Sequence, residues 1–437
     1  MPESSSVDKP LLLKGGTIVN HDVTFKADVL IHDGIIQAIG EELSCPSDTR
    51  VVDVSHKLLL PGGVDLDCHI GVADSFDPVA DNYVSAGKAA LLGGTTTIVN
   101  TINAHPDRSL ISTIHSEAAL RCFIEQRRMC RGLLYGQTSV SAIAAPLVAI
   151  NSNDCANGVF TSSKDWATAA SYVNCPPLRP DVQLSQKLLT HLISEDLVSV
   201  GSGHRAITTA VRATFGLKNP LKIPHGIAAL GCRMIVLWRH GVESGSLDPC
   251  TFVKVTSTNP ARLMNLYPQK GRIAVGSDAD IIIWSNSFKQ ENFKNIFPND
   301  VPNIFTVTTS SYQSGPEMVL LRGRIVVENN ELLDDACCGV LLTSQPFSQY
   351  VYGRVNAVEK NVNSEYTPLS REPYMGNVAN DAPVDNSDHS KEGYYFRKEY
   401  FDNMPKEALP PGQRKIHTSV KTAQPPGGSS NAFWMNE

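Results

Sequence analysis

The stretch Pro61-Gly62-Gly63-Val64-Asp65-Leu66-Asp67-Cys68-His69-Ile70 decides how the chain folds. It follows the apolar run Leu58–Leu60, and its Pro-Gly-Gly turn leads into alternating apolar and polar side chains, which is typical of a short strand. Two acids and a histidine gather where this strand should end. Since the carboxyl ends of the strands carry the chemistry of a parallel barrel, the stretch predicts the entry strand of an α/β barrel with a polar mouth.

Strand-like segments on both sides of the barrel predict a second, smaller β domain. Between Leu11 and Val54, apolar residues recur at near-alternate positions between Gly and Asp-Gly turns. The same pattern returns from Gly271 to Trp284 and from Met318 to Val327. Two β-rich ends around an α/β middle predict one composite β-sandwich into which the barrel is inserted.

The middle of the chain alternates helices and strands but is short for a barrel. Ala86–Leu92 is expected to be a helix, Thr95–Asn100 a strand, and Ser109–Cys130 a single long helix. We count four or five βα units between Pro61 and Thr258, roughly 200 residues, whereas a complete barrel usually needs ~250. The barrel is therefore expected to lack some of its units.

Composition indicates a protein of the cytosol. The 437 residues carry a net charge of −6, which does not favour nucleic acid as a partner, and no apolar run is long enough to insert into a membrane. Ten scattered cysteines, two of them adjacent at Cys337 and Cys338, are read as reduced thiols. After about residue 361 the chain is too poor in apolar residues to fold, which predicts a disordered tail.

Two further segments carry a family resemblance. Ser163–Asp181 and, more specifically, Thr256–Asp280 resemble the dihydropyrimidinase and hydantoinase branch of the cyclic amidohydrolases. The resemblance implies an amidohydrolase-type (β/α) barrel with a composite β-sandwich. We expect the N-terminal part of the sandwich at 11–60, the shortened barrel at 61–265, the C-terminal part of the sandwich at 266–345, a helix that contacts another subunit at 346–360, and a disordered regulatory tail at 361–437.

The enzymes of this branch use a bimetallic centre, as the resemblance implies. Two metal ions, typically zinc, share a carboxylated lysine and are held by histidines and an aspartate that also moves the proton. In this chain Asp67 stands in place of the first histidine, and only His69 keeps the paired position. Gly203, in Gly201-Ser202-Gly203-His204, replaces the acid–base aspartate.

Other expected site residues are also missing. Where the family places the lysine and two further histidines, this chain is predicted to have one helix, and His115 within it is read as a surface residue. Gln137 replaces a glutamate, and Ala228-Ala229 replaces an Asn-Gly pair that contacts substrate. We therefore predict no catalytic, cofactor or metal residue, with Asp67, His69 and Gly203 as vestigial positions; His69 is then simply a polar residue at the barrel mouth.

A subgroup of the family shows the same losses. Residues 424–431 resemble the tail of the collapsin response mediator proteins, also called dihydropyrimidinase-related proteins. This resemblance implies a non-catalytic cytoplasmic adaptor in neuronal processes, which binds tubulin or other cytoskeletal proteins during neurite outgrowth and axon guidance. It also implies a tetramer of identical or related chains, with contacts at 346–352; the alternative for this segment is an amphipathic helix packed on its own barrel. The resemblance further implies phosphorylation of the tail, for which Thr367 is a candidate.

Two alternatives remain open at the level of sequence. The first is a zinc-dependent cyclic amidohydrolase that cleaves a cyclic amide bond at a rearranged site. The second is a shortened isoform that modulates the assembly of full-length relatives. In either case the missing barrel units should leave apolar edges uncovered and lower the stability of the fold.

Overall fold

The computed structural model describes residues 9–71, 79–100, 111–129, 134–144, 165–179, 181–286, 301–302, 304–305, 313–329, 331–333, 339–345 and 348–353. Every structural statement below concerns these residues. They all belong to one compact unit, Met1–Thr367, and none lies in the second unit, Pro368–Glu437. The predicted tail, the phosphorylation candidate Thr367 and the Cys337–Cys338 pair lie outside the described residues.

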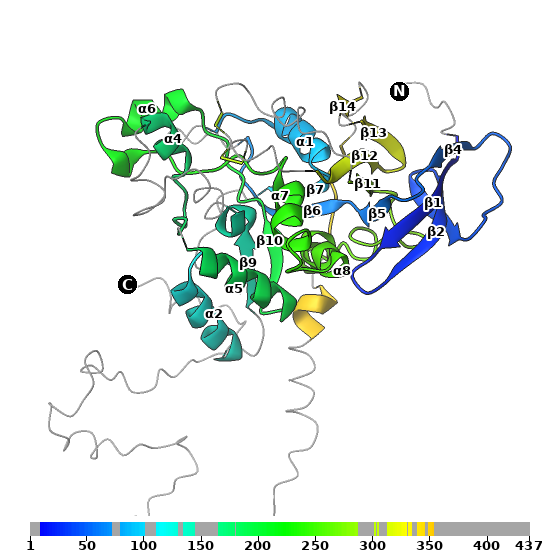
Figure 1. Cartoon of the computed structure of the whole chain (residues 1–437), viewed down its shortest axis with the longest axis horizontal. Helices are drawn as coiled ribbons and strands as arrows, with labels where there is room; N and C mark the ends of the chain where they lie inside the picture. The colour runs from blue at the N-terminus through cyan, green and yellow to red at the C-terminus, as the bar shows by residue number, and fades with distance from the viewer. Residues whose placement is uncertain are drawn as a thin grey trace, which may run out of the picture. The chain divides into compact units, whose positions relative to one another are not determined.

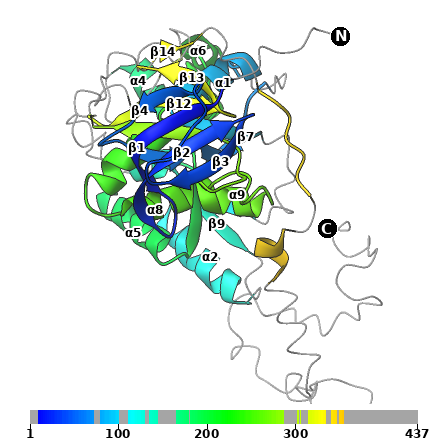
Figure 2. The ribbon, with the colours of Figure 1, turned by 90° about the vertical axis from the view of Figure 1, so that its right-hand side faces the viewer.

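A nine-stranded mixed sheet joins the two ends of the described chain (Figures 1 and 2). Its strands are β1 (Leu11–Val19), β2 (Thr24–His32), β3 (Ile35–Gly40), β4 (Arg50–Asp53), β5 (Leu58–Pro61), β11 (Ile281–Ser285), β12 (Gly315–Leu321), β13 (Arg324–Glu328) and β14 (Glu331–Leu332). The order is β14-β13-β12-β11-β5-β1-β2-β3, and β4 pairs with β1. Because β5 lies between β1 and β11, strands from both ends of the described chain share one sheet, as the repeated strand pattern predicted.

Five parallel strands form the barrel part of the fold. They are β6 (Gly63–Cys68), β7 (Thr95–Asn100), β8 (Ile111–Thr113), β9 (Tyr135–Ser139) and β10 (Leu197–Gly201). β6 pairs with β7, and β9 pairs with both β8 and β10. A parallel bridge between Cys68 and His204 joins the two sets at the ends of β6 and β10. Among the described residues, the strands thus form an arc, β7-β6-β10-β9-β8, with β7 and β8 at its two ends.

Helices cover the strands. They are α1 (Tyr83–Leu92), α2 (Glu117–Met129), α4 (Trp166–Ser171), α5 (Val182–Ile193), α6 (Thr209–Gly216), α7 (Arg233–Leu237), α8 (Pro249–Val253) and α9 (Asn259–Leu263), with the 3-10 turn η2 (Pro220–Lys222) and the π-helical turns η3 (Trp238–Val242) and η4 (Lys254–Thr258). Among the described helices, none is long and apolar enough to cross a membrane.

The expected helix Ser109–Cys130 is wrong in its first part. Its N-terminal residues form β8, which pairs with β9, and α2 begins only at Glu117. The run Ile111–Ile114 is rich in β-branched residues, which suit a pleated strand better than a helix. The described arc therefore contains a strand, β8, for which the sequence reading left no room.

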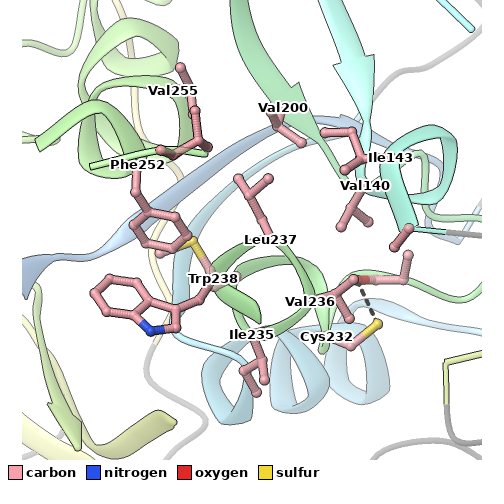
Figure 3. Packing of buried hydrophobic residues seen from close by; sticks show 14 of the residues in the cluster. Val140, Ile143, Val200, Cys232, Ile235, Val236, Leu237, Trp238, Phe252 and Val255 are labelled. Carbon is pink, nitrogen blue, oxygen red and sulfur yellow. Dashed lines mark hydrogen bonds between the residues drawn. The ribbon is translucent and has the colours of Figure 1, made fainter. Parts of the chain in front are cut away.

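The main core lies between the arc and the helices α5, α7 and α8 (Figure 3). Trp238 packs edge-on against Phe252, with ring centroids 5.0 Å apart, and lies 4.8 Å from the ring of Trp284 on β11. Burial of three aromatic rings contributes several kcal/mol of hydrophobic stabilisation and fixes the large sheet against η3 and α8. The polar ends of the arc strands are held on this rigid base.

Candidate functional site at the barrel mouth

Polar residues from four strands meet at the carboxyl edge of the arc. Asp67 lies on β6, Ser139 ends β9, His115 follows β8 and Gly203 follows β10. A Cβ placed on Gly203 would lie 3.9 Å from both Asp67 Oδ2 and Ser139 Oγ. The Ser139 hydroxyl is in turn 2.8 Å from His115 Nε2. The arc therefore gathers an acid, a hydroxyl and an imidazole around the position where Gly203 has no side chain.

The Asp67 carboxyl is held in an unusual state. Only 16% of its side chain is exposed, and His69 Nε2 is 4.0 Å from its Oδ1. Burial raises the pKa of Asp67 to about 7, and the neighbouring charge of Asp65 adds to this rise. Close packing with β10 enforces the position, because a Cβ on Gly201 would come within 2.6 Å of the Asp67 Cβ.

Asp65, two residues earlier on β6, is fully buried and faces the guanidinium of Arg233. It accepts hydrogen bonds from the backbone N–H groups of Ser202 at 3.0 Å and of Asp67 at 3.2 Å. Its Oδ2 is 4.0 Å from Nε of the fully buried Arg233. That guanidinium donates to the carbonyl of Val200 at 2.9 Å, so Arg233 fixes β6 to β10 below the mouth.

His115 corrects a prediction, since it is buried rather than a surface residue. His115 is 4% exposed, and α2 begins two residues later. Nδ1 lies 3.1 Å from the Pro176 carbonyl, which can only accept a hydrogen bond, so Nδ1 carries the proton. Nε2 then accepts from the Ser139 hydroxyl. Burial lowers the pKa of His115, which favours this neutral form.

His204 is also engaged through both ring nitrogens. Its Nε2 is 2.7 Å from Oδ2 of the buried Asp81, and its Nδ1 accepts hydrogen bonds from the backbone N–H groups of Ala229 and Leu230, each at 3.2 Å. The Ala228-Ala229 segment, which replaces the family's Asn-Gly pair, thus binds a protein histidine. Sequence reasoning missed the His204–Asp81 pair because the two residues lie far apart along the chain.

Gln137 is a structural residue of the arc. Its Nε2 donates to Thr113 Oγ1 at 3.0 Å, and its Oε1 accepts from the Ser199 hydroxyl at 3.4 Å. One side chain therefore ties β8, β9 and β10 together. An uncharged amide meets both neighbours, whereas a carboxylate there could only accept.

The bimetallic centre that the resemblance implies does not fit the described residues. His115 and His204 use both ring nitrogens within the protein, and Gly203 offers no donor atom. Asp67 and His69 remain, yet the described residues contain no group of three or more histidine, cysteine, aspartate or glutamate side chains placed to hold a metal ion. Two donors at the end of one strand leave most of a metal's coordination sphere to water.

Comparison with known proteins places the fold. Residues 196–326 match the sequence profile of the amidohydrolase family. Dihydropyrimidinase-related protein 5 of Homo sapiens is 27% identical over 513 residues, covering 86% of this chain and 88% of the relative. Dihydropyrimidinase of Rattus norvegicus is 28% identical over 496 residues, covering 84% and 95%. The chain is therefore homologous to both kinds of protein.

Solved structures agree on the architecture. The crystal structure of dihydropyrimidinase from Brevibacillus agri NCHU1002 superposes with a TM-score of 0.60 at 22% identity, covering 74% of this chain and 96% of the other. D-hydantoinase from Thermus sp. superposes with a TM-score of 0.60 at 20% identity, covering 77% of this chain and 99% of the other. The expected amidohydrolase-type α/β fold is confirmed, while the choice between enzyme and non-catalytic relative rests on the site.

Proposed function

We propose that this chain, a homologue of dihydropyrimidinase-related proteins and dihydropyrimidinases, is a non-catalytic adaptor that acts through protein contacts. The observation that carries the proposal is the use of both ring nitrogens of His115 and His204 in hydrogen bonds within the protein. Residue 203 has no side chain, and the two histidines at the barrel mouth bond other parts of the protein. The barrel mouth therefore links strands and loops to one another rather than presenting groups for catalysis.

The partners proposed are tubulin or other cytoskeletal proteins, in the cytoplasm of neuronal processes, with roles in neurite outgrowth and axon guidance. This choice follows from the resemblance to the collapsin response mediator proteins. The proposed assembly is a homotetramer or a mixed tetramer with related chains, and Thr367 is the proposed regulatory phosphorylation site. No metal or other cofactor is proposed for this function.

Metal content and turnover test the non-catalytic part. The purified chain, loaded with zinc and then desalted, should retain well under one equivalent of zinc and should not hydrolyse dihydrouracil, while a homologous dihydropyrimidinase treated in the same way does both. Two equivalents of zinc together with turnover would end the proposal. The double variant Asp67→His with Gly203→Asp puts back two of the side chains that the family uses. Zinc retention by this variant shows whether the loss of these two groups alone accounts for weak zinc binding.

Microtubule co-sedimentation tests the partner. The full chain should pellet with taxol-stabilised microtubules in a saturable manner and remain in the supernatant without them. Light scattering after size exclusion gives the number of chains in the particle. A chain that does not pellet at micromolar tubulin would remove tubulin as the partner without affecting the argument from the barrel mouth.

A metal-dependent cyclic amidohydrolase is the second candidate. It is favoured by the meeting of Asp67 and His115 at one strand edge and by the raised pKa of Asp67, since perturbed carboxyls are common in active sites. A third candidate is a shortened isoform that modulates full-length relatives, favoured by β7 and β8, each of which pairs with only one strand in the described part of the chain. Co-purification of a tagged full-length relative with this chain, but not with an unrelated barrel protein, would support it.

A further inference from the structure

A groove of about 480 Å³ follows strand β7. Every residue from Thr96 to Asn100 lines it, and the opposite walls come from Met264, Leu266 and the segment Gly339–Leu342. These walls are largely apolar. None of Asp67, His115, Ser139 and Gly203 lines the groove, and the function proposed above does not use it.

The strand beside the groove has one open edge. β6 is the only described strand that pairs with β7, so the main-chain groups of the other edge bond no strand of the described structure. Thr97 belongs to the same wall; the residue is 6% exposed, and its hydroxyl has no hydrogen-bond partner. An open strand edge next to an apolar groove is the arrangement into which an extended peptide adds as a further strand.

A cation marks one end of the groove. Arg322 lines it with an exposed side chain, and its guanidinium forms no ion pair with the described residues. The other lysine or arginine in the wall, Lys270, is already bound to Asp278 at 2.9 Å and to Asp280 at 2.6 Å. Arg322 is therefore the uncommitted positive charge among the described residues that line the groove.

Hydrogen bonds show which end of β7 this is. The Arg322 backbone N–H donates to Asp280 Oδ1 at 2.8 Å, and the Asp280 carbonyl accepts from the backbone N–H of Gly62 at 2.8 Å. Gly62 packs directly against the Thr96 side chain, near the start of β7. A strand that runs antiparallel to β7 therefore finishes, with its carboxyl end, at the Arg322 end of the groove.

We propose that this groove binds an extended peptide segment of another protein, which adds to β7 as an antiparallel strand. Alternate apolar side chains of the peptide fill the groove, and an acidic side chain or a free C-terminal carboxylate pairs with Arg322. The inference does not rest on the proposed function, since Asp67, His69, His115 and Gly203 do not line this groove.

The test uses the full chain and two bead-bound libraries of random octapeptides, one with free C-terminal carboxylates and one amidated. Peptides enriched from the first library should alternate apolar residues and carry acid at or near the C-terminus. Their dissociation constants, measured by fluorescence anisotropy, should rise at least tenfold for Arg322→Glu and stay unchanged for Arg50→Glu, an exposed arginine on β4. Both changes affect exposed side chains, and circular dichroism checks that both variants fold.

Hydrogen exchange locates the bound peptide. Addition of an enriched peptide should slow exchange at the amides of β7 and leave β8, at the other end of the arc, unchanged. The proposal is overturned if the libraries enrich no peptide, if enriched peptides bind Arg322→Glu as tightly as the parent chain, if protection appears away from β7, or if the groove is occupied by a second copy of this chain.

Discussion

His204 and Asp81 form a buried hydrogen bond of 2.7 Å that fastens the end of β10 to the start of α1. Asp81 directly precedes Asn82, whose side chain caps α1 by accepting from the backbone N–H groups of Val84 and Ser85. The same imidazole holds the backbone at Ala229. One ring therefore positions three segments at the barrel mouth.

Removing one partner of this bond should be costly. Asp81→Ala leaves a buried imidazole N–H without an acceptor, and we expect the free energy of unfolding to fall by about 2–3 kcal/mol. Urea denaturation followed by circular dichroism measures the loss. Asp48→Ala, at an exposed acid, is the control and should change stability by no more than about 0.5 kcal/mol. Equal effects of the two changes would contradict the role given to His204.

Two buried threonines should respond in opposite directions to the same change. The Thr97 hydroxyl lacks a partner, so Thr97→Val removes an unsatisfied group and should raise the free energy of unfolding by about 1 kcal/mol. The Thr138 hydroxyl donates to the Ile114 carbonyl at 2.8 Å, so Thr138→Val should lower it by about 1–3 kcal/mol. Thermal melts of the two variants provide the comparison, and a loss of stability in both would refute it.

The raised pKa of Asp67 predicts a pH dependence of stability. Between the ordinary aspartate value of 3.8 and about 7, the folded chain holds a proton on Asp67 that the unfolded chain releases. Since the native state binds more protons, this residue's contribution to stability falls as pH rises through that window, at up to about 1.4 kcal/mol per pH unit. Asp67→Asn should flatten the decline. Chemical denaturation at several pH values measures it, and an unchanged slope in the variant would speak against a raised pKa.

Substitution by alanine should change the free energy of unfolding in opposite directions at Gly201 and at Gly87. Gly201→Ala places a methyl group 2.6 Å from the Asp67 Cβ and should cost about 1–3 kcal/mol, because the backbone or the Asp67 side chain must shift to relieve the contact. Gly87 lies within α1 with nothing within 4 Å of an added Cβ. Gly87→Ala should therefore stabilise the chain by about 0.5–1 kcal/mol through helix propensity alone. A tolerated Gly201→Ala would show that the packing of β6 on β10 is looser than described.

The sequence correctly predicted the elements whose own residues show a clear helix or strand pattern. The helix expected at Ala86–Leu92 is α1, which begins slightly earlier, at Tyr83, because Asn82 supplies a cap that the apolar pattern alone did not reveal. The strand expected at Thr95–Asn100 is β7, as its β-branched run indicated. The composite sheet followed from the repeated strand pattern at both ends.

The site could be predicted only in part. The stretch around Asp67 and the stretch around Gly203 were each legible because the residues within each stretch are consecutive, whereas their partners lie elsewhere in the sequence. β8 is three residues long and precedes an amphipathic helix. The sequence analysis therefore assigned β8 and His115 to that helix. The Ser139–His115 and His204–Asp81 contacts depend on how strands are ordered in the arc, which no local pattern encodes.

The large sheet also constrains the order in which the chain can acquire its structure. Ile281 of β11 pairs with Pro61 of β5, so the ribosome must deliver every barrel strand before this neighbour of β5 exists. During synthesis, β1, β2 and β3 can pair early. β5 can then pair with β1, but its other edge stays unpaired until β11 has been synthesised. Such late closure gives slow, high-contact-order folding and a long window in which a nascent chain is exposed to misassembly.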